Sequence, residues 1–256
     1  MMRRLLRENY ETFMKDLGQN VKDIKFRKAI RSLARNSPVK FAEIEASVAE
    51  LLPTQNEIDV DKSLKWPLTN VASAEQFLFC GKNPVKVGNN YIITAHQGLY
   101  IVDGHHRWSQ VYSINPKCNI AAIDLIDLDD PIEALKATQF GIAAGKDASG
   151  YEISTIPSSI VLGKNLLTYS EAEVKEYVNK MITADVMAVF NRFDSNLDSK
   201  EKIGNYIWGN VKAMQTDNLP VSGAPGRGIM PQTDLVVNWR DNLVNVEGAL
   251  DRMRGI

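Results

Sequence analysis

The sequence is poor in the residues that hold small secreted domains together. Only two cysteines, Cys80 and Cys118, occur among its 256 residues, and they form no C-x-x-C pair. Two cysteines so far apart in the sequence predict neither a disulfide framework nor a zinc site. A reducing compartment is therefore the default expectation.

Long hydrophobic runs are also missing. No apolar stretch approaches the roughly 20 residues that a helix needs to cross a bilayer. The first residues include Arg3, Arg4 and Arg7, where a signal peptide would need an apolar core. We therefore expect a cytoplasmic protein with no membrane partner.

A strong charge of either sign is the third absence. The chain has 30 Lys and Arg residues against 31 Asp and Glu residues, so its formal net charge is −1. This balance argues against a protein that coats nucleic acid over its whole surface, although local patches stay open. With 44% hydrophobic residues, the chain is long enough for one large domain or for a core domain with helical extensions.

The sequence divides into three regions, of which the first is a basic arm. Over positions 1–37 there are ten Lys and Arg residues but only four acidic residues, and apolar residues recur at helical spacing. We therefore expect a basic helical arm over residues 1–40. Two interpretations stay open: a solvated helical face that packs on the body of the protein, which is the commoner case, or a contact for DNA, RNA or an acidic partner.

The second region, residues 41–130, predicts a mixed α+β domain, because short apolar runs alternate with turn residues. A hairpin turn is expected at 88–90 and a second turn at 97–98. The expected strands cover 84–87, 91–94, 99–102 and 119–128, with a short helix over 74–80.

The third region, residues 131–256, predicts mainly helices. They are expected over 131–140, after a capping box at Ser170–Glu173, over 200–214 and over 246–254. The glycine- and proline-rich stretch 219–234 is the longest connection. Within it GAPGRG, residues 223–228, lacks the lysine of a P-loop and predicts a flexible loop, of the kind that can close over a ligand. The stretch 194–198, DSNLD, is similar to a calcium loop, but Ser199 stands where glycine is needed, so no calcium site is expected.

The stretch Asp103-Gly104-His105-His106-Arg107 stands where an apolar strand stops and a helix begins. Gly104 allows a sharp turn and a close backbone approach to a ligand. The amides that follow point outward at a helix N-terminus, which favours an anion. His105, His106 and Arg107 add donors that can hold phosphate oxygens, with the Asp103 carboxylate at the rim.

Two other interpretations of the histidine pair compete with this phosphate site. Zinc is a poor fit, because adjacent histidines on one helical turn point in different directions and only His96 is near in the sequence. A structural role is open for one of the two histidines, since buried histidines that bond to the backbone are common. The phosphate interpretation is favoured over both.

The stretch IVDGHHRWSQVYSINP resembles the signature loop of the ParB/sulfiredoxin-like superfamily, in which a strand, a glycine-containing turn and a helix bind nucleotide phosphates. ELLPTQNEIDVDKSL, residues 50–64, is similar to the first conserved box of the same proteins. The resemblance covers residues 48–128. It implies an α+β fold, a ParB/sulfiredoxin-like mixed sheet with helices, flanked here by N-terminal and C-terminal helical extensions.

Within the superfamily, the residue sequence of this loop resembles that of the free-serine kinases. His105 stands where sulfiredoxins carry their reactive cysteine, so that chemistry lacks its nucleophile. The resemblance implies that Glu57 and Asp103 are catalytic carboxylates, with Asp59 and Asp61 as weaker matches for Glu57. It gives the phosphates to Gly104, His105, His106 and Arg107. It also implies ATP or ADP, Mg²⁺ and a small hydroxyl-bearing acceptor.

Three further residues are weighed against plainer roles. Gln55 can bond a base, a ribose or a phosphate, or lie in a surface turn. Lys62 can neutralise a phosphate, but a solvated ion pair is the commoner role. Trp108 is expected in the core rather than as a stacking platform.

The function expected from the sequence is therefore a nucleotide-binding phosphotransferase. The alternative is a ParB-like DNA-binding protein or nuclease that uses nucleotide as a ligand and contacts DNA through the basic arm. A binding scaffold without catalysis stays open as a third class. The pair PTQNEID and DGHHRWSQ is similar to a version found in tailed bacteriophages, which implies the cytoplasm of a bacterial host.

Overall fold

The structure is a computed structural model that describes residues 41–125, 129–132, 134–135 and 164–226. The basic arm over 1–40 and the helix expected over 246–254 lie outside these residues. So does most of the helix expected over 131–140.

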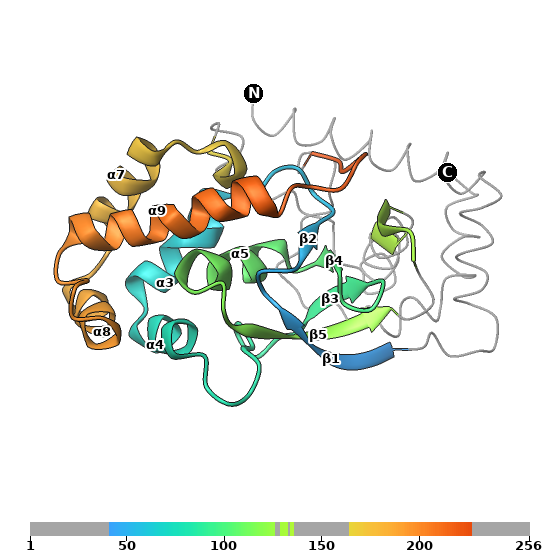
Figure 1. Ribbon diagram of the computed structural model, residues 1–256, viewed down its shortest axis with the longest axis horizontal. Helices are drawn as coiled ribbons and strands as arrows, with labels where there is room; N and C mark the ends of the chain where they lie inside the picture. The colour runs from blue at the N-terminus through green and yellow to red at the C-terminus, as the bar shows by residue number, and fades with distance from the viewer. Residues whose placement is uncertain (1–40, 126–128, 133, 136–163, 227–256) are drawn as a thin grey trace, which may run out of the picture.

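The described residues form a five-stranded mixed sheet with helices, which confirms the α+β class (Figure 1). The sheet order is β1-β5-β3-β4-β2. Strands β3 and β5 are parallel, as are β2 and β4, whereas β1 pairs with β5 and β3 pairs with β4 in antiparallel fashion. The strands are β1 (Phe41–Ser47), β2 (Leu52–Pro53), β3 (Ile92–Ala95), β4 (Tyr100–Asp103) and β5 (Asn119–Leu125).

The two turns predicted from the sequence are present. Gly88 and Asn89 both have φ of 60°, and Val87 and Asn90 pair across them, as a tight hairpin turn requires. Gln97 and Gly98 also have positive φ, at 56° and 83°, between β3 and β4. Both turns were recognisable because the residues that tolerate this backbone conformation occur together.

Most of the described helical residues gather on one side of the sheet, and those at 131–132 and 134–135 lie apart from them (Figure 1). The expected helix near 74–80, the capping box at Ser170 and the helix from Lys200 are confirmed. A helical stretch before α4 and the helix α8 were not predicted. The helical elements are η1 (Asp61–Lys65), α3 (Trp66–Thr69), α4 (Val71–Phe79), α5 (His105–Ile114), η3 (Leu166–Thr168), α7 (Glu171–Met181), α8 (Ala184–Phe193) and α9 (Lys200–Asp217).

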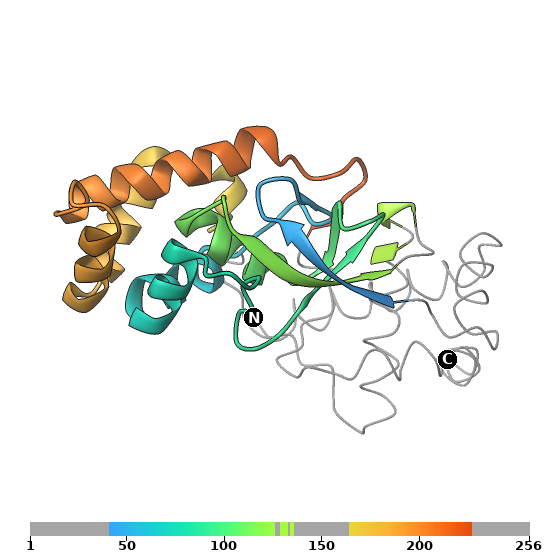
Figure 2. The same cartoon turned by 60° about the horizontal axis from the view of Figure 1, so that its bottom comes forward.

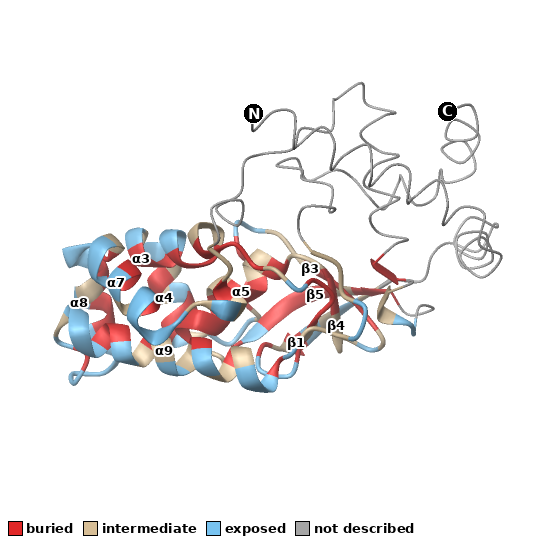
Figure 3. Cartoon of the chain, turned by 90° about the horizontal axis from the view of Figure 1, so that it is seen from above, coloured by how far each residue is buried: buried red, intermediate tan, exposed pale blue. Residues whose placement is uncertain are grey.

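Helix α5 is the centre of the core. Trp108, Val111 and Ile114 on this helix are fully buried, in one apolar cluster with residues of the sheet and of α7, α8 and α9. Figure 3 shows buried residues on the strands and on the helices alike. The indole Nε1 of Trp108 donates to the carbonyl oxygen of Val48 at 2.9 Å. The prediction that Trp108 belongs to the core is therefore confirmed.

The prediction for the cysteines is wrong. Cys80 ends α4 and Cys118 precedes β5, and the structure joins them in a disulfide with their Cα atoms 5.3 Å apart. Asn115, at the end of α5, donates through Nδ2 to the carbonyl of Leu78 at 2.8 Å and lies beside Cys80. The two cysteines are 38 positions apart in the sequence, and this spacing carries no information about which ends of helices and strands meet.

None of the described helices combines the length and the apolar character that crossing a membrane requires.

Helix α7 is tied to η1 by one buried contact. The Tyr177 hydroxyl donates to Oδ1 of Asp61 at 2.6 Å, and Tyr177 is 9% exposed. Burial raises the pKa of Tyr177, and the hydrogen bond to the Asp61 carboxylate raises it further. Helix α7 is thus joined to the last part of the stretch 50–64.

Replacing Tyr177 by Phe should destabilise the fold by about 1–2 kcal/mol at pH 7, because the Asp61 carboxylate loses its donor. Since the folded pKa is raised, the contribution of the tyrosine is fully present below the unfolded value near 10 and is lost as pH rises above it. Urea unfolding at pH 7 and at pH 10.5 should show a smaller alkaline loss for Tyr177→Phe than for the wild type. Tyr100→Phe, on strand β4, is the matched control and should keep the wild-type stability at pH 7.

Candidate functional site

The site lies where the parallel strands β2 and β4 end. Leu52 pairs with Tyr100 and Pro53 with Ile101. Continued by two residues, this register places position 55 level with Asp103. The loop of residues 54–60, which we call the first-box loop, therefore leaves the sheet beside the N-terminus of α5, so the two stretches that carry the resemblance lie next to each other.

Gly104 makes the turn between β4 and α5 with φ of 97°, in the left-handed region that favours glycine. A Cβ at this position would lie 2.7 Å from Cγ2 of Ile92 and 3.0 Å from Nη2 of Arg107. The sharp turn that the sequence predicted at Gly104 is therefore present, and its close approach to a ligand stays a prediction. The amides of that turn carry the partial positive charge of a helix N-terminus.

Both histidines bond to backbone amides of the first-box loop. Nε2 of His105 accepts from the amide of Thr54 at 3.1 Å, and His105 is 3% exposed. Nε2 of His106 accepts from the amide of Asp59 at 3.2 Å. An Nε2 that accepts a hydrogen bond carries no proton, so a neutral ring has its proton on Nδ1. The structural role left open for one histidine thus applies to both, and their contact with phosphate stays a prediction.

Arg107 and Asp103 pair with each other. Nη2 of Arg107 donates to Oδ2 of Asp103 at 2.8 Å, and the two side chains are 25% and 43% exposed. Nε of Arg107 is buried and has no hydrogen-bond partner among the described residues. The guanidinium therefore has one buried donor that no described residue satisfies.

The acidic and amide side chains of residues 55–61 differ in burial and in their hydrogen bonds. Gln55 is buried, and its Nε2 donates to the carbonyl of Glu57, so its expected alternative as a surface turn residue is wrong. Asp59 is buried, and its Oδ1 accepts from the amide of Lys62 at 3.1 Å. Asp61 receives the Tyr177 hydroxyl. Glu57, the best match in the sequence, remains partly exposed at the site.

Lys62 contacts helix α5 through its backbone carbonyl. Its carbonyl accepts from Nε2 of Gln110 at 2.8 Å, which joins η1 to the middle of α5. Ser63 and Ser109 make a second link between the same elements, with their hydroxyl oxygens 2.8 Å apart. The structure thus fixes the position of η1 and leaves the proposed contact of the Lys62 ammonium with phosphate as a prediction.

Two functional neighbours of the loop were missed by sequence reasoning. Asn165 accepts from the amide of Ile58 at 2.9 Å and donates through Nδ2 to the carbonyl of Asn56 at 3.2 Å. The amide of Asn56 donates to the carbonyl of Pro225 at 3.1 Å. These partners lie more than 100 residues away, and a single asparagine or proline gives no signal that could have identified them.

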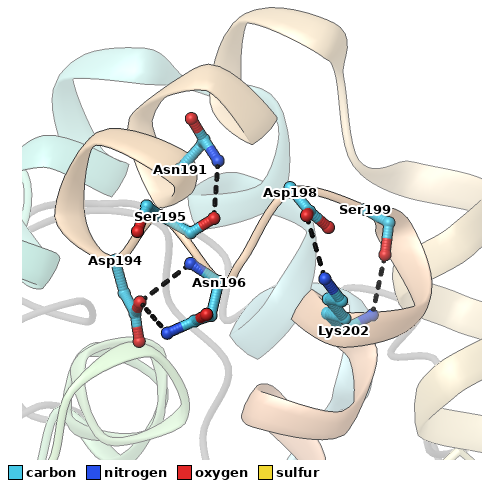
Figure 4. Close-up of polar contacts among 7 residues, drawn as sticks. All are labelled: Asn191, Asp194, Ser195, Asn196, Asp198, Ser199 and Lys202. Carbon is cyan, nitrogen blue, oxygen red and sulfur yellow. Dashed lines mark hydrogen bonds and ion pairs between the residues drawn. The ribbon is translucent and has the colours of Figure 1, made fainter.

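No three His, Cys, Asp or Glu side chains gather as a metal site within the described part of the chain. The acidic stretch at 194–198 caps and connects helices (Figure 4). Asp194 accepts from the amide of Asn196 at 2.9 Å, Asp198 pairs with Lys202 at 2.9 Å, and Ser199 caps α9.

Comparisons with models of protein families, with curated proteins and with solved structures found no match.

Gly104→Ala should destabilise the protein by about 2–4 kcal/mol, from left-handed backbone strain and from close contacts with Ile92. Chemical denaturation monitored by circular dichroism measures the change. Gly209→Ala is the control, because a Cβ there meets nothing within 4 Å on α9. It should be neutral or stabilising by up to about 1 kcal/mol. Equal stability of the two variants would show that the turn does not need glycine.

Proposed function

We propose that this chain is a nucleotide-binding phosphotransferase of ParB/sulfiredoxin-like fold, which moves a phosphoryl group from ATP or ADP to a hydroxyl acceptor. The observation that carries the proposal is the environment of Arg107. Its guanidinium lies in the first turn of α5, beside the helix N-terminus, and its Nε is buried without a partner among the described residues. A phosphate oxygen satisfies this donor and the helix dipole together.

The two histidines support the proposed site by holding the first-box loop in place. Their bonds to Thr54 and Asp59 hold the first-box loop beside α5 at 3.1 and 3.2 Å. Phosphoryl transfer depends mainly on positioning and charge neutralisation, so a loop fixed at two of its amides is well suited to carry Glu57. His106 is the more exposed of the two histidines. It is therefore the one better placed to contact a phosphate.

The two carboxylates take different roles. Asp103 pairs with Arg107 and so stands at the phosphate end. Glu57 lies on the neighbouring loop and accepts the proton of the attacking hydroxyl. The hydroxyl oxygen forms a new bond to the terminal phosphorus, and the bond from that phosphorus to the bridging oxygen breaks. ATP then leaves as ADP, or ADP as AMP.

The residues present fit Mg²⁺ as part of this proposal. Magnesium usually keeps several waters and binds through one or two carboxylates plus the substrate phosphates, so a cage of three protein ligands is not required. Asp103 is the residue that would hold it. Bound there, the ion would neutralise charge on the phosphates.

The alternative is a ParB-like DNA-binding protein or nuclease with nucleotide as a ligand, and the basic composition of residues 1–40 favours it. A scaffold that binds nucleotide without catalysis is the third reading of the same site. DNA binding that weakens with salt, survives Asp103→Asn and fails without residues 1–37 would support the DNA-binding function.

Arg107→Ala should weaken ATP binding at least about tenfold, because a charge-assisted contact to phosphate is lost. Isothermal titration calorimetry with ATP and Mg²⁺ measures the affinity. Arg192→Ala is the matched control, since Arg192 pairs with Glu75 on another part of the surface. If both variants bind ATP as the wild type does, Arg107 does not hold the nucleotide.

Asp103→Asn should separate binding from turnover. Loss of the carboxylate should lower phosphoryl transfer at least about 100-fold. In titrations without Mg²⁺, removal of the partner of Arg107 should leave ATP affinity unchanged or raise it by roughly two- to fivefold. Titration calorimetry and release of labelled phosphate measure the two effects.

Asp198→Asn is the control for this experiment, because Asp198 forms an ion pair of the same i,i+4 spacing at the start of α9. It should change neither binding nor transfer. Full turnover by Asp103→Asn would remove this carboxylate from the mechanism.

A further inference from the structure

Residues 219–226 follow α9 and return to the first-box loop, and we call them the strap. In Figures 1 and 2 the strap, at the orange-red end of the described chain, runs beside the blue segment that follows β2. It lies outside the part of the sequence that resembles the ParB/sulfiredoxin-like superfamily. The strap is therefore an addition that this chain makes to its own site.

One end of the strap is firmly anchored. Asn218 precedes it and is 1% exposed. Its Nδ2 donates to the carbonyls of Ala49 and Leu51 at 2.8 and 2.9 Å, and its Oδ1 accepts from the Tyr112 hydroxyl at 2.7 Å. Buried polar groups with all these partners are costly to displace, so this end stays in place.

The other end is held by a lighter contact. The amide of Asn56 donates to the carbonyl of Pro225 at 3.1 Å, and its Nδ2 donates to the carbonyl of Ala224 at 3.0 Å. Val221 donates to the carbonyl of Pro53 at 3.0 Å. No strap residue is buried, and Leu219 is 60% exposed. A segment held by a few hydrogen bonds, without buried apolar side chains, opens more readily than the core.

The far end of the strap lies directly against the proposed proton acceptor. A Cβ at Gly226 would stand 3.2 Å from Oε2 of Glu57 and 3.6 Å from Oδ1 of Asn56. The backbone of the strap therefore limits where the Glu57 carboxylate can lie. A side chain at Gly226 would push this carboxylate or the strap aside.

We propose that the strap positions Glu57 and closes the acceptor side of the site, with Asn56 as the latch and Asn218 as the fixed end. The strap opens at Asn56 to admit the hydroxyl acceptor and closes to hold Glu57 against it. The part of this inference that concerns the acceptor rests on the proposed function. Asn56 and Gly226 are positioning residues, since they act through Glu57.

The test uses three variants of the full chain. Asn56→Ala removes the side-chain half of the latch, and Gly226→Ala places a methyl group against Glu57. Gly81→Ala is the control, because a Cβ there meets nothing within 4 Å. Hydrogen exchange of the strap amides and the carboxyl ¹³C resonance of Glu57 are measured first, without nucleotide.

Asn56→Ala should speed exchange at Val221 and Ala224 at least fivefold, while Tyr112 and other core amides exchange as in the wild type. Gly226→Ala should shift the Glu57 resonance, and Gly81→Ala should change neither signal. If exchange and resonance stay at wild-type values in both strap variants, the strap proposal is overturned.

ATP turnover with water as acceptor then tests the link to function. Asn56→Ala and Gly226→Ala should lower kcat at least fivefold and change ATP affinity less than twofold. Unchanged kcat in both, with an active wild type, overturns the positioning role. A wild type that neither binds nor turns over nucleotide overturns the proposed function instead, and the exchange and resonance results then decide the strap proposal by themselves.

Discussion

The bonds from two imidazoles to two backbone amides are the contact on which the site depends. Thr54 and Asp59 lie near the two ends of the first-box loop. The backbone amide of each donates a hydrogen bond to a histidine at the start of α5. Trp108 packs α5 into the core, and the loop is bonded to α5, so the loop is held in a fixed position relative to the core. A loop attached in this way presents its remaining side chains in one arrangement, which is what a reacting site requires.

This contact also explains why the histidines stand side by side. Neighbouring residues on a helix point in different directions, so one ring reaches the beginning of the loop and the other reaches its end. The same divergence that makes the pair a poor metal site makes it a good brace for a segment of six residues. Arg107 is the next residue on the helix, and its guanidinium pairs with the Asp103 carboxylate.

The sequence predicted best what depends on neighbouring residues. The glycine and asparagine at 88 and 89 indicated their turn, Ser170 and Glu173 their capping box, and Trp108 its burial. It predicted poorly what depends on distant contacts. Nothing local at Asn165 or Asn56 reveals a partner more than 100 residues away, and the disulfide between Cys80 and Cys118 depends on how α4 meets β5. The candidate site was thus recognisable as a pair of boxes, whereas the groups that brace it were not.

The short strand β2 lies at the outer edge of the sheet, where exposed backbone groups can pair with another chain. It has only two residues, and one of them, Pro53, has no amide hydrogen to offer. The carbonyl of Pro53 is taken by Val221. The strap therefore covers this edge of the sheet at Pro53, so the strand that leads into the site is shielded from edge-to-edge aggregation.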